Sequence, residues 1–78
     1  MKTIKYKKEV SVIKQLRNEL KISQEEMARK IKISQPFLSC LERRTKKISI
    51  DDILSTLALA KKNGIFISIE DMARDYKK

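Results

Sequence analysis

Histidine is absent from this 78-residue chain, and cysteine, glycine and proline occur once each. Without histidine, and with Cys40 as the single thiol, the chain can build neither a Cys/His metal cluster nor an internal disulfide. One glycine rules out a glycine-rich phosphate loop, and no nucleophile has a base at a useful spacing. We therefore expect no enzyme, no catalytic residues, no cofactor and no metal site. So little glycine and proline also favours helices over a turn-rich β fold.

Long apolar runs are missing as well. None approaches the roughly 20 residues that cross a membrane, and residues 1–6 lack the apolar stretch of a signal peptide. A lone cysteine is typical of a reducing compartment. We expect a cytoplasmic protein that has no membrane partner.

Positive charge is abundant: 19 lysines and arginines stand against 10 acidic residues, a net charge of +9. Such an excess attracts polyanions, chiefly nucleic acid or an anionic membrane surface. The alternative is a set of solvated lysines with no ligand. Four lysines fall in residues 1–8, which form either a basic arm that follows a DNA groove or a tail without contacts. Within this arm, Ile4 and Tyr6 alternate as in a short strand.

Apolar residues recur at helical spacing from Glu9 to Leu20 and again to Ile31. Ser23 followed by Glu26 is a capping box that opens the second of these helices. Ser34 is an N-cap for a third, with Pro36 in its first turn, where a missing amide costs nothing. Two short capped helices joined by about three residues predict a helix-turn-helix from about Ile22 to Arg44.

A further helix is expected after the basic linker that follows Arg44. Ser49 with Asp52 caps it, and Asn63–Gly64 ends it. Residues 65–67 suggest a short strand, and Ser68 starts a last helix. We predict an all-α chain of four to five helices, four of them in a domain over residues 9–63 that the basic arm 1–8 precedes. The segment 64–78 follows, with the short strand as its one β element.

Four segments carry a resemblance to a known family. They are Leu16–Arg17, the run Ser23–Ala28 (SQEEMA), the run Ile33–Glu42 (ISQPFLSCLE) and the run Ser49–Ile53 (SIDDI). In this order and spacing they resemble the Cro/phage-repressor (XRE-type) helix-turn-helix family over about residues 10–63. The resemblance implies a phage-repressor-like fold and double-stranded DNA as the partner.

Three positions depart from the family pattern. Lys32 stands where the turn between the two helices usually has glycine, Arg43–Arg44 replace a common Asn-Gly pair, and Ile48 replaces a frequent proline. If Lys32 takes a left-handed backbone, the lysine costs about 1 kcal/mol. The departures concern the loops rather than the helices.

The resemblance also implies roles for individual residues. Arg17 and Glu42 match an ion pair that braces the first helix against the third, the alternative being two unrelated surface charges. Gln24 matches a phosphate contact at a helix N-terminus. On the outward face of the third helix, base contacts fall to Gln35, Pro36, Ser39 and Cys40. The remaining phosphate contacts fall to Ser34, Phe37, Arg43, Arg44, Lys46 and Lys47.

Several of these assignments have alternatives. The alternative for Gln24 is an exposed glutamine that favours the helix and makes no DNA contact. Phe37 packs either along the DNA backbone or against the second helix. Ser39 either bonds a base or allows close packing, and Cys40 as a redox switch is the less favoured reading of that thiol.

The C-terminal segment is apolar for a chain end. We expect it to form a homodimer interface through Ile65, Phe66, Ile67, Ile69 and Met72. The alternative is that these residues close over the core of the first and fourth helices.

Taken together, the sequence predicts a sequence-specific transcriptional regulator, repressor-like, that binds a palindromic operator as a homodimer. One alternative is an antitoxin that binds a toxin and also represses its own operon. Another is a protein-interaction module of the same fold without DNA binding, against which the presence of Gln24, Gln35 and Arg43 counts.

Overall fold

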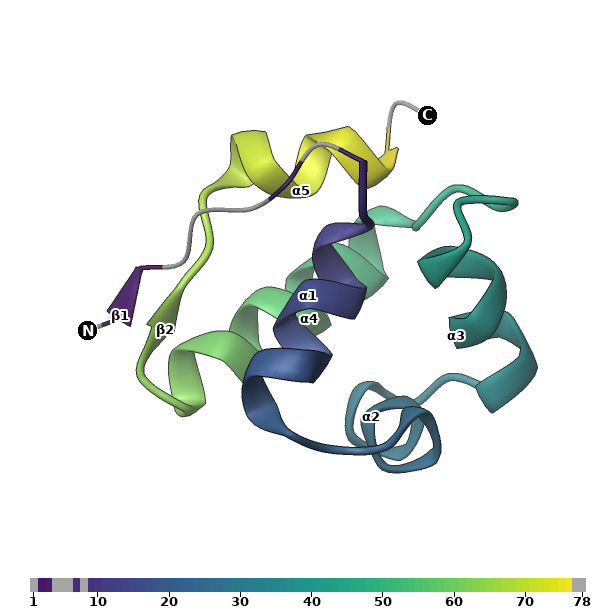
Figure 1. The fold of residues 1–78 in the computed structure, drawn as a ribbon, viewed down its shortest axis with the longest axis horizontal. Helices are drawn as coiled ribbons and strands as arrows, with labels where there is room; N and C mark the ends of the chain where they lie inside the picture. Colours follow the sequence, from purple (N-terminus) through teal and green to yellow (C-terminus); the bar gives the residue numbers. More distant parts are fainter. Residues whose placement is uncertain (1, 4–6, 8, 77–78) are drawn as a thin grey trace.

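The part of the chain that the structure describes forms five short helices and one pair of very short strands (Figure 1). The computed structural model describes residues 2–3, 7 and 9–76, and it places the side chains of residues 7 and 9–73. In chain order the elements are β1 (Lys2–Thr3), α1 (Val12–Leu20), α2 (Gln24–Ile31), α3 (Gln35–Glu42), α4 (Ile50–Lys62), β2 (Ile65–Phe66) and α5 (Ile69–Tyr76). The predicted all-α fold class is confirmed, and the expected short strand is present as β2.

A serine caps the start of every helix. The hydroxyl oxygens of Ser23, Ser34 and Ser49 each accept a hydrogen bond from the backbone amide three residues later. Ser68 does the same for α5. The prediction of a first helix from Glu9 was wrong, because Ser11 caps α1 and the helix begins only at Val12. Each cap satisfies an amide that has no partner within its own helix.

The core draws on all five helices, each helix contributing the apolar stripe that its spacing predicts. Val12, Ile13 and Leu16 of α1 meet Met27 of α2 and Leu38 of α3, all fully buried. Ile53 and Ala60 of α4 belong to the same cluster. A chain this short can bury only a small core, so all of these apolar residues are needed for the stability of the fold.

The C-terminal segment completes that core. Ile65, Ile67 and Met72 are buried in the same cluster as the helices before them. The segment packs in two places, β2 against α4 and α5 against α1. Figure 1 shows α5 lying across one end of the molecule, opposite α2. Residues 64–76 are therefore packed as part of the domain.

The N-terminal arm is attached where the structure describes it. β1 pairs in parallel with β2, with Lys2 opposite Ile65. The side-chain amide of Gln15 holds the backbone of Lys7 from both sides, in hydrogen bonds of 2.9 and 3.0 Å. The strand suggested at Ile4 and Tyr6 and the lysines at 5 and 8 lie outside the described residues. The described parts of the arm lie on the body of the domain.

Three cationic residues have a left-handed backbone. Lys21 ends α1 with φ 58°, Lys32 ends α2 with φ 63°, and Arg44 follows α3 with φ 60°. The backbone thus keeps the conformation that glycine favours at Lys32 and Arg44, two of the positions where this sequence departs from the family. A non-glycine residue in this conformation is strained by roughly 1–2 kcal/mol.

Replacing Lys32 with glycine is expected to raise the free energy of unfolding by about 1 kcal/mol, because glycine removes the left-handed strain. Urea unfolding followed by far-ultraviolet circular dichroism measures the change. Lys14→Gly is the matched control: it is an exposed lysine within α1, where glycine should destabilise by about 1 kcal/mol. If both variants lose stability equally, the strain at Lys32 is absent.

Candidate nucleic-acid interface

The helix α3 stands at the edge of the molecule with one face turned outward (Figure 1). Leu38 and Leu41 are buried and hold the helix to the core, whereas Gln35 and Pro36 are exposed. Ser39 and Cys40 are half-buried on the outward side. We call Gln35, Pro36, Ser39 and Cys40 the reading face. It presents one amide, one hydroxyl and one thiol on a short helix.

An ion pair fixes the direction of this helix. Arg17 in α1 donates to both carboxylate oxygens of Glu42 at the end of α3, from Nε at 2.7 Å and from Nη2 at 3.1 Å. Its third bond, from Nη1, goes to the carbonyl of Ile22 at 3.0 Å. The side chains are only 16% and 4% exposed. The expected pair between Arg17 and Glu42 is thus present, bidentate and shielded from water.

Gln24 joins the same network. Its Nε2 donates to Glu42 Oε1 at 3.1 Å, and the side chain is half-buried. The sequence assigned this residue to a DNA phosphate and gave no sign of the internal bond. A primary amide carries two N–H donors, so the bond to Glu42 leaves one for an anion at the start of α2. Gln24 therefore links the start of α2 to the end of α3.

The two arginines after α3 lie in different places. Arg43 is exposed and folds back over the reading face, donating from Nη1 to Ser39 Oγ and from Nη2 to Cys40 Sγ at 3.7 Å. Arg44 is half-buried and donates from Nη2 to the carbonyl of Val10 at 3.1 Å. Arg44 was assigned to a phosphate, but here it ties the end of α3 to the segment before α1. Arg43 is the arginine that lies on the outward side.

The remaining residues assigned to phosphate fall into two groups. Ser34 is the N-cap of α3, and its hydroxyl oxygen accepts a hydrogen bond from the backbone amide of Phe37. Phe37 is half-buried against the core, which favours the packing alternative for its ring. Lys46 and Lys47 are exposed on the loop between α3 and α4. That loop follows α3 in the chain, so both lysines come within a few residues of the end of the helix that carries the reading face.

The five residues assigned to a dimer interface are divided by the structure. Ile65, Ile67 and Met72 are buried in the core of the same chain, as the alternative had it. Phe66 and Ile69 remain 51% and 65% exposed. A second copy of this conformation can meet only those two of the five.

Neither a candidate membrane-spanning helix nor a candidate metal cluster occurs among the described residues. Among residues 2–3, 7 and 9–76, no helix is long and apolar enough to cross a membrane. The same residues contain no cluster of three or more cysteine or acidic side chains that could hold a metal ion.

These features define a class of protein. Two capped helices, α2 and α3, are joined by a short left-handed turn, and the second presents an exposed polar face beside a basic loop. This is the arrangement of a helix-turn-helix domain.

Comparison with known families leads to the same class. The helix-turn-helix family of the Cro/C1 (XRE) type matches residues 13–55. The match spans α1 to the first part of α4, and the chain belongs to this family of DNA-binding regulators. No curated protein and no solved structure matches the chain.

Proposed function

We propose that the chain is a sequence-specific transcriptional repressor that binds a two-fold symmetric operator as a homodimer. One observation carries the proposal: the reading face is held rigid by the buried pair of Arg17 and Glu42 and carries Gln35 at its most exposed end. A polar side chain on a braced helix is what base recognition in the major groove requires.

Gln35 is the principal base contact of this proposal. As the first residue of α3 it is exposed, and its amide matches the N7 acceptor and N6 donor of adenine. Arg43 lies along the same face through Ser39 and Cys40. Its guanidinium can leave those partners and donate to guanine O6 and N7 or to a phosphate. Pro36 adds an apolar contact of the kind that suits a thymine methyl group.

Phosphate contacts surround this face. The amide of Gln24 stands at the start of α2, where the helix dipole also favours an anion. Lys46 and Lys47 extend the positive charge beyond the end of α3. Such contacts fix the register of the protein on the duplex, and the bases then supply the specificity. Arg44 is engaged with Val10 and acts as a structural residue.

Lys47→Ala is expected to weaken binding to all duplexes alike and to lower the slope of log K against log salt concentration by about one unit. The physical reason is that one fewer counterion is released from DNA. Fluorescence anisotropy of a labelled duplex over a range of salt concentrations measures the slope. Lys62→Ala is the control, because Lys62 is an exposed lysine in the last turn of α4. That end of α4 lies beside β2, on the side of the molecule away from α3 (Figure 1). A slope unchanged in Lys47→Ala, or equally changed in Lys62→Ala, contradicts the assignment.

The dimer contact is proposed to centre on Phe66 and Ile69. Both are large, apolar and more than half exposed, on a segment in which Ile65, Ile67 and Met72 are buried. Phe66 also borders a hollow of about 270 Å³ that is lined by Leu57, Lys61, Ile65 and Ile67. A second copy of the chain would fill that hollow. The dimer would then bind two half-sites of one duplex with two reading faces, and its affinity would exceed that of one short reading face.

The double variant Phe66→Ser/Ile69→Ser is expected to lose at least about tenfold in affinity for a duplex with two half-sites, since about 1.4 kcal/mol of contact is removed. Binding to a single half-site should not change. Ile50→Ser/Leu54→Ser is the matched control, because these two residues are each 56% exposed on α4. Sedimentation of the complexes reports the number of copies bound. If the control pair shows the loss instead, the interface lies on α4.

A further inference from the structure

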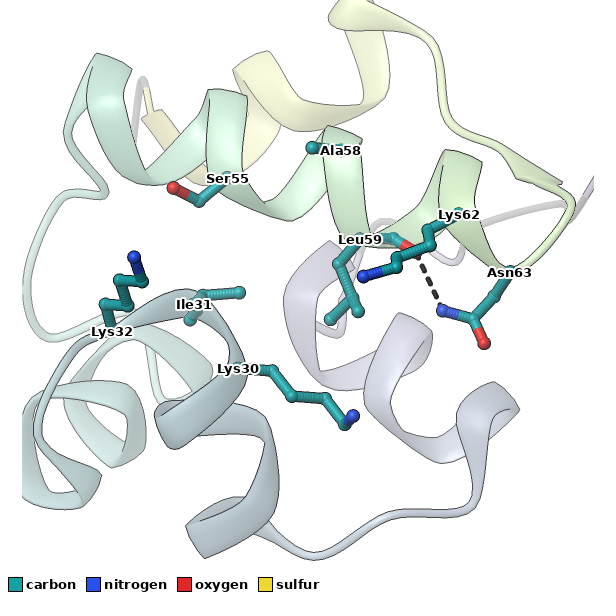
Figure 2. Close-up of a pocket in the computed structure, with 8 residues that line it drawn as sticks. All are labelled: Lys30, Ile31, Lys32, Ser55, Ala58, Leu59, Lys62 and Asn63. Atoms are coloured by element: carbon teal, nitrogen blue, oxygen red, sulfur yellow. Dashed lines mark hydrogen bonds between the residues drawn. The ribbon is translucent and has the colours of Figure 1, made fainter.

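A groove separates the ends of α2 and α4 on a surface that none of the proposed DNA contacts reaches. Its volume is about 480 Å³, and Figure 2 shows the side chains around it. Ile31 and Leu59 lie between the two helices and form an apolar floor. The remaining lining residues are Lys30, Lys32, Ser55, Ala58, Lys62 and Asn63. We call this the lysine groove.

Three ammonium groups surround the apolar floor. Lys30 and Lys32 come from the end of α2, and Lys62 extends from α4 toward α2 (Figure 2). All three side chains are exposed. Lys30 has a distant partner, Glu26, at 3.9 Å, and no carboxylate lines the groove. Lysines at helix ends offset the helix dipoles, but that role does not require them to line one hollow from two helices.

Exposed apolar residues continue from the groove along α4. Leu54 stands one turn before Ala58, and Ile50 one turn before Leu54, so the three share a face of the helix. Leu54 and Ile50 are each 56% exposed. A hollow with an apolar floor, a cationic rim and an apolar extension complements a segment that has both carboxylates and apolar side chains.

We propose that the lysine groove binds an acidic amphipathic segment of a partner protein. An apolar side chain of the segment would rest on Ile31 and Leu59, and its carboxylates would pair with Lys32 and Lys62. Charge complementarity selects this occupant over a second copy of the chain, which carries a net charge of +9. Because no lining residue is among the proposed DNA contacts, the partner and DNA would bind the same molecule together.

The test uses a synthetic amphipathic helical peptide with glutamates on one face and leucines on the other. A matched peptide has glutamine in place of every glutamate. Fluorescence anisotropy gives the affinities, and amide chemical shifts of the full chain locate the peptide. Lys32→Glu/Lys62→Glu is expected to weaken binding of the glutamate peptide about tenfold. The reason is that two exposed charge pairs, each contributing a few tenths to about 1 kcal/mol, become repulsive.

The chain supplies a matched control, Lys14→Glu/Lys21→Glu. Lys21 ends α1 with the same left-handed backbone as Lys32, and Lys14 is an exposed lysine within α1. Both double variants therefore change the net charge equally, and neither residue of the control lines the groove. The proposal expects the control to bind the acidic peptide as the unmodified chain does, with shifts at Ile31, Ser55 and Leu59.

Four results would overturn the proposal. Equal weakening in both double variants would mean unspecific attraction to a basic chain. Shifts concentrated at Gln35 and Ser39 would mean that the peptide imitates DNA at the reading face. Equal affinity for the glutamine peptide, or no binding of the glutamate peptide, would leave the lysines without a role. None of these results depends on whether the chain represses transcription.

Discussion

Arg17→Met is expected to lower the free energy of unfolding by about 3 kcal/mol, because it leaves the Glu42 carboxylate buried without its cation. That carboxylate is 4% exposed and would retain only the bond from Gln24. The loss is a large part of the 5–15 kcal/mol that typically stabilises a whole domain. Urea unfolding followed by circular dichroism measures it. DNA binding should fall as well, since α3 loses the contact that orients it.

Two further variants make this prediction specific. Lys30→Met breaks the exposed pair of Lys30 and Glu26, which should cost less than about 0.5 kcal/mol. Arg17→Met/Glu42→Leu removes both charges and should recover much of the stability, because no buried charge is left unpaired. If Arg17→Met lowers the free energy of unfolding no more than Lys30→Met does, the network of Arg17 and Glu42 stabilises the fold no more than an exposed ion pair.

Gln35→Ala is expected to lose about 1–3 kcal/mol of discrimination for each half-site, or roughly tenfold to a hundredfold at one base pair. The exposed amide at the start of α3 is the longest neutral polar side chain on the reading face, so its loss should relax specificity at that position. Competition among duplexes that vary one base pair at a time measures the effect. The unfolding free energy should hardly change, since Gln35 is exposed.

The comparison with Lys47→Ala separates base contact from phosphate contact. A base contact gives a loss confined to one position of the duplex, whereas a phosphate contact weakens every sequence alike. If Gln35→Ala weakens all duplexes equally, or leaves the preferred base pair unchanged, then Gln35 does not read a base. Arg43, which lies over Ser39 and Cys40, would then be the leading candidate.

Local sequence signals predicted much of the fold. Ser23, Ser34 and Ser49 marked the starts of three helices because a capping serine needs only its own helix to act. Ser11 caps α1 in the same way, whereas the apolar spacing alone puts the start of that helix at Glu9. Because Lys32 stands where the family usually has glycine, a left-handed backbone could be considered there from the sequence. The structure has that backbone, with φ 63°.

Contacts between distant segments were harder to foresee. The pair of Arg17 and Glu42 came from family resemblance, because nothing local links residues 25 positions apart. The family resemblance and the chemistry of their side chains assign Gln24 and Arg44 to phosphates. Their hydrogen bonds to Glu42 and Val10 depend on how the helices pack. In the C-terminal segment, apolar composition could not separate the buried Ile67 from the exposed Ile69.

The lysine groove could not be predicted from the sequence either. Lys30, Lys32 and Lys62 are spread over two helices, and in the sequence they resemble any other solvated lysines of a basic chain. Only packing of α2 against α4 brings them around one apolar hollow. Positive charge thus serves two separate surfaces in these proposals, one around α3 for DNA and one between α2 and α4 for a protein.

The central claim is that a braced α3 reads a two-fold symmetric DNA sequence. The most direct test is selection of bound duplexes from a random-sequence pool by the full chain, followed by sequencing. We predict an enriched motif with two inverted half-sites about one helical turn apart, with a position in each half-site that loses its preference in Gln35→Ala. Uniform binding without an enriched motif would contradict the claim and leave only unspecific attraction between a basic chain and DNA.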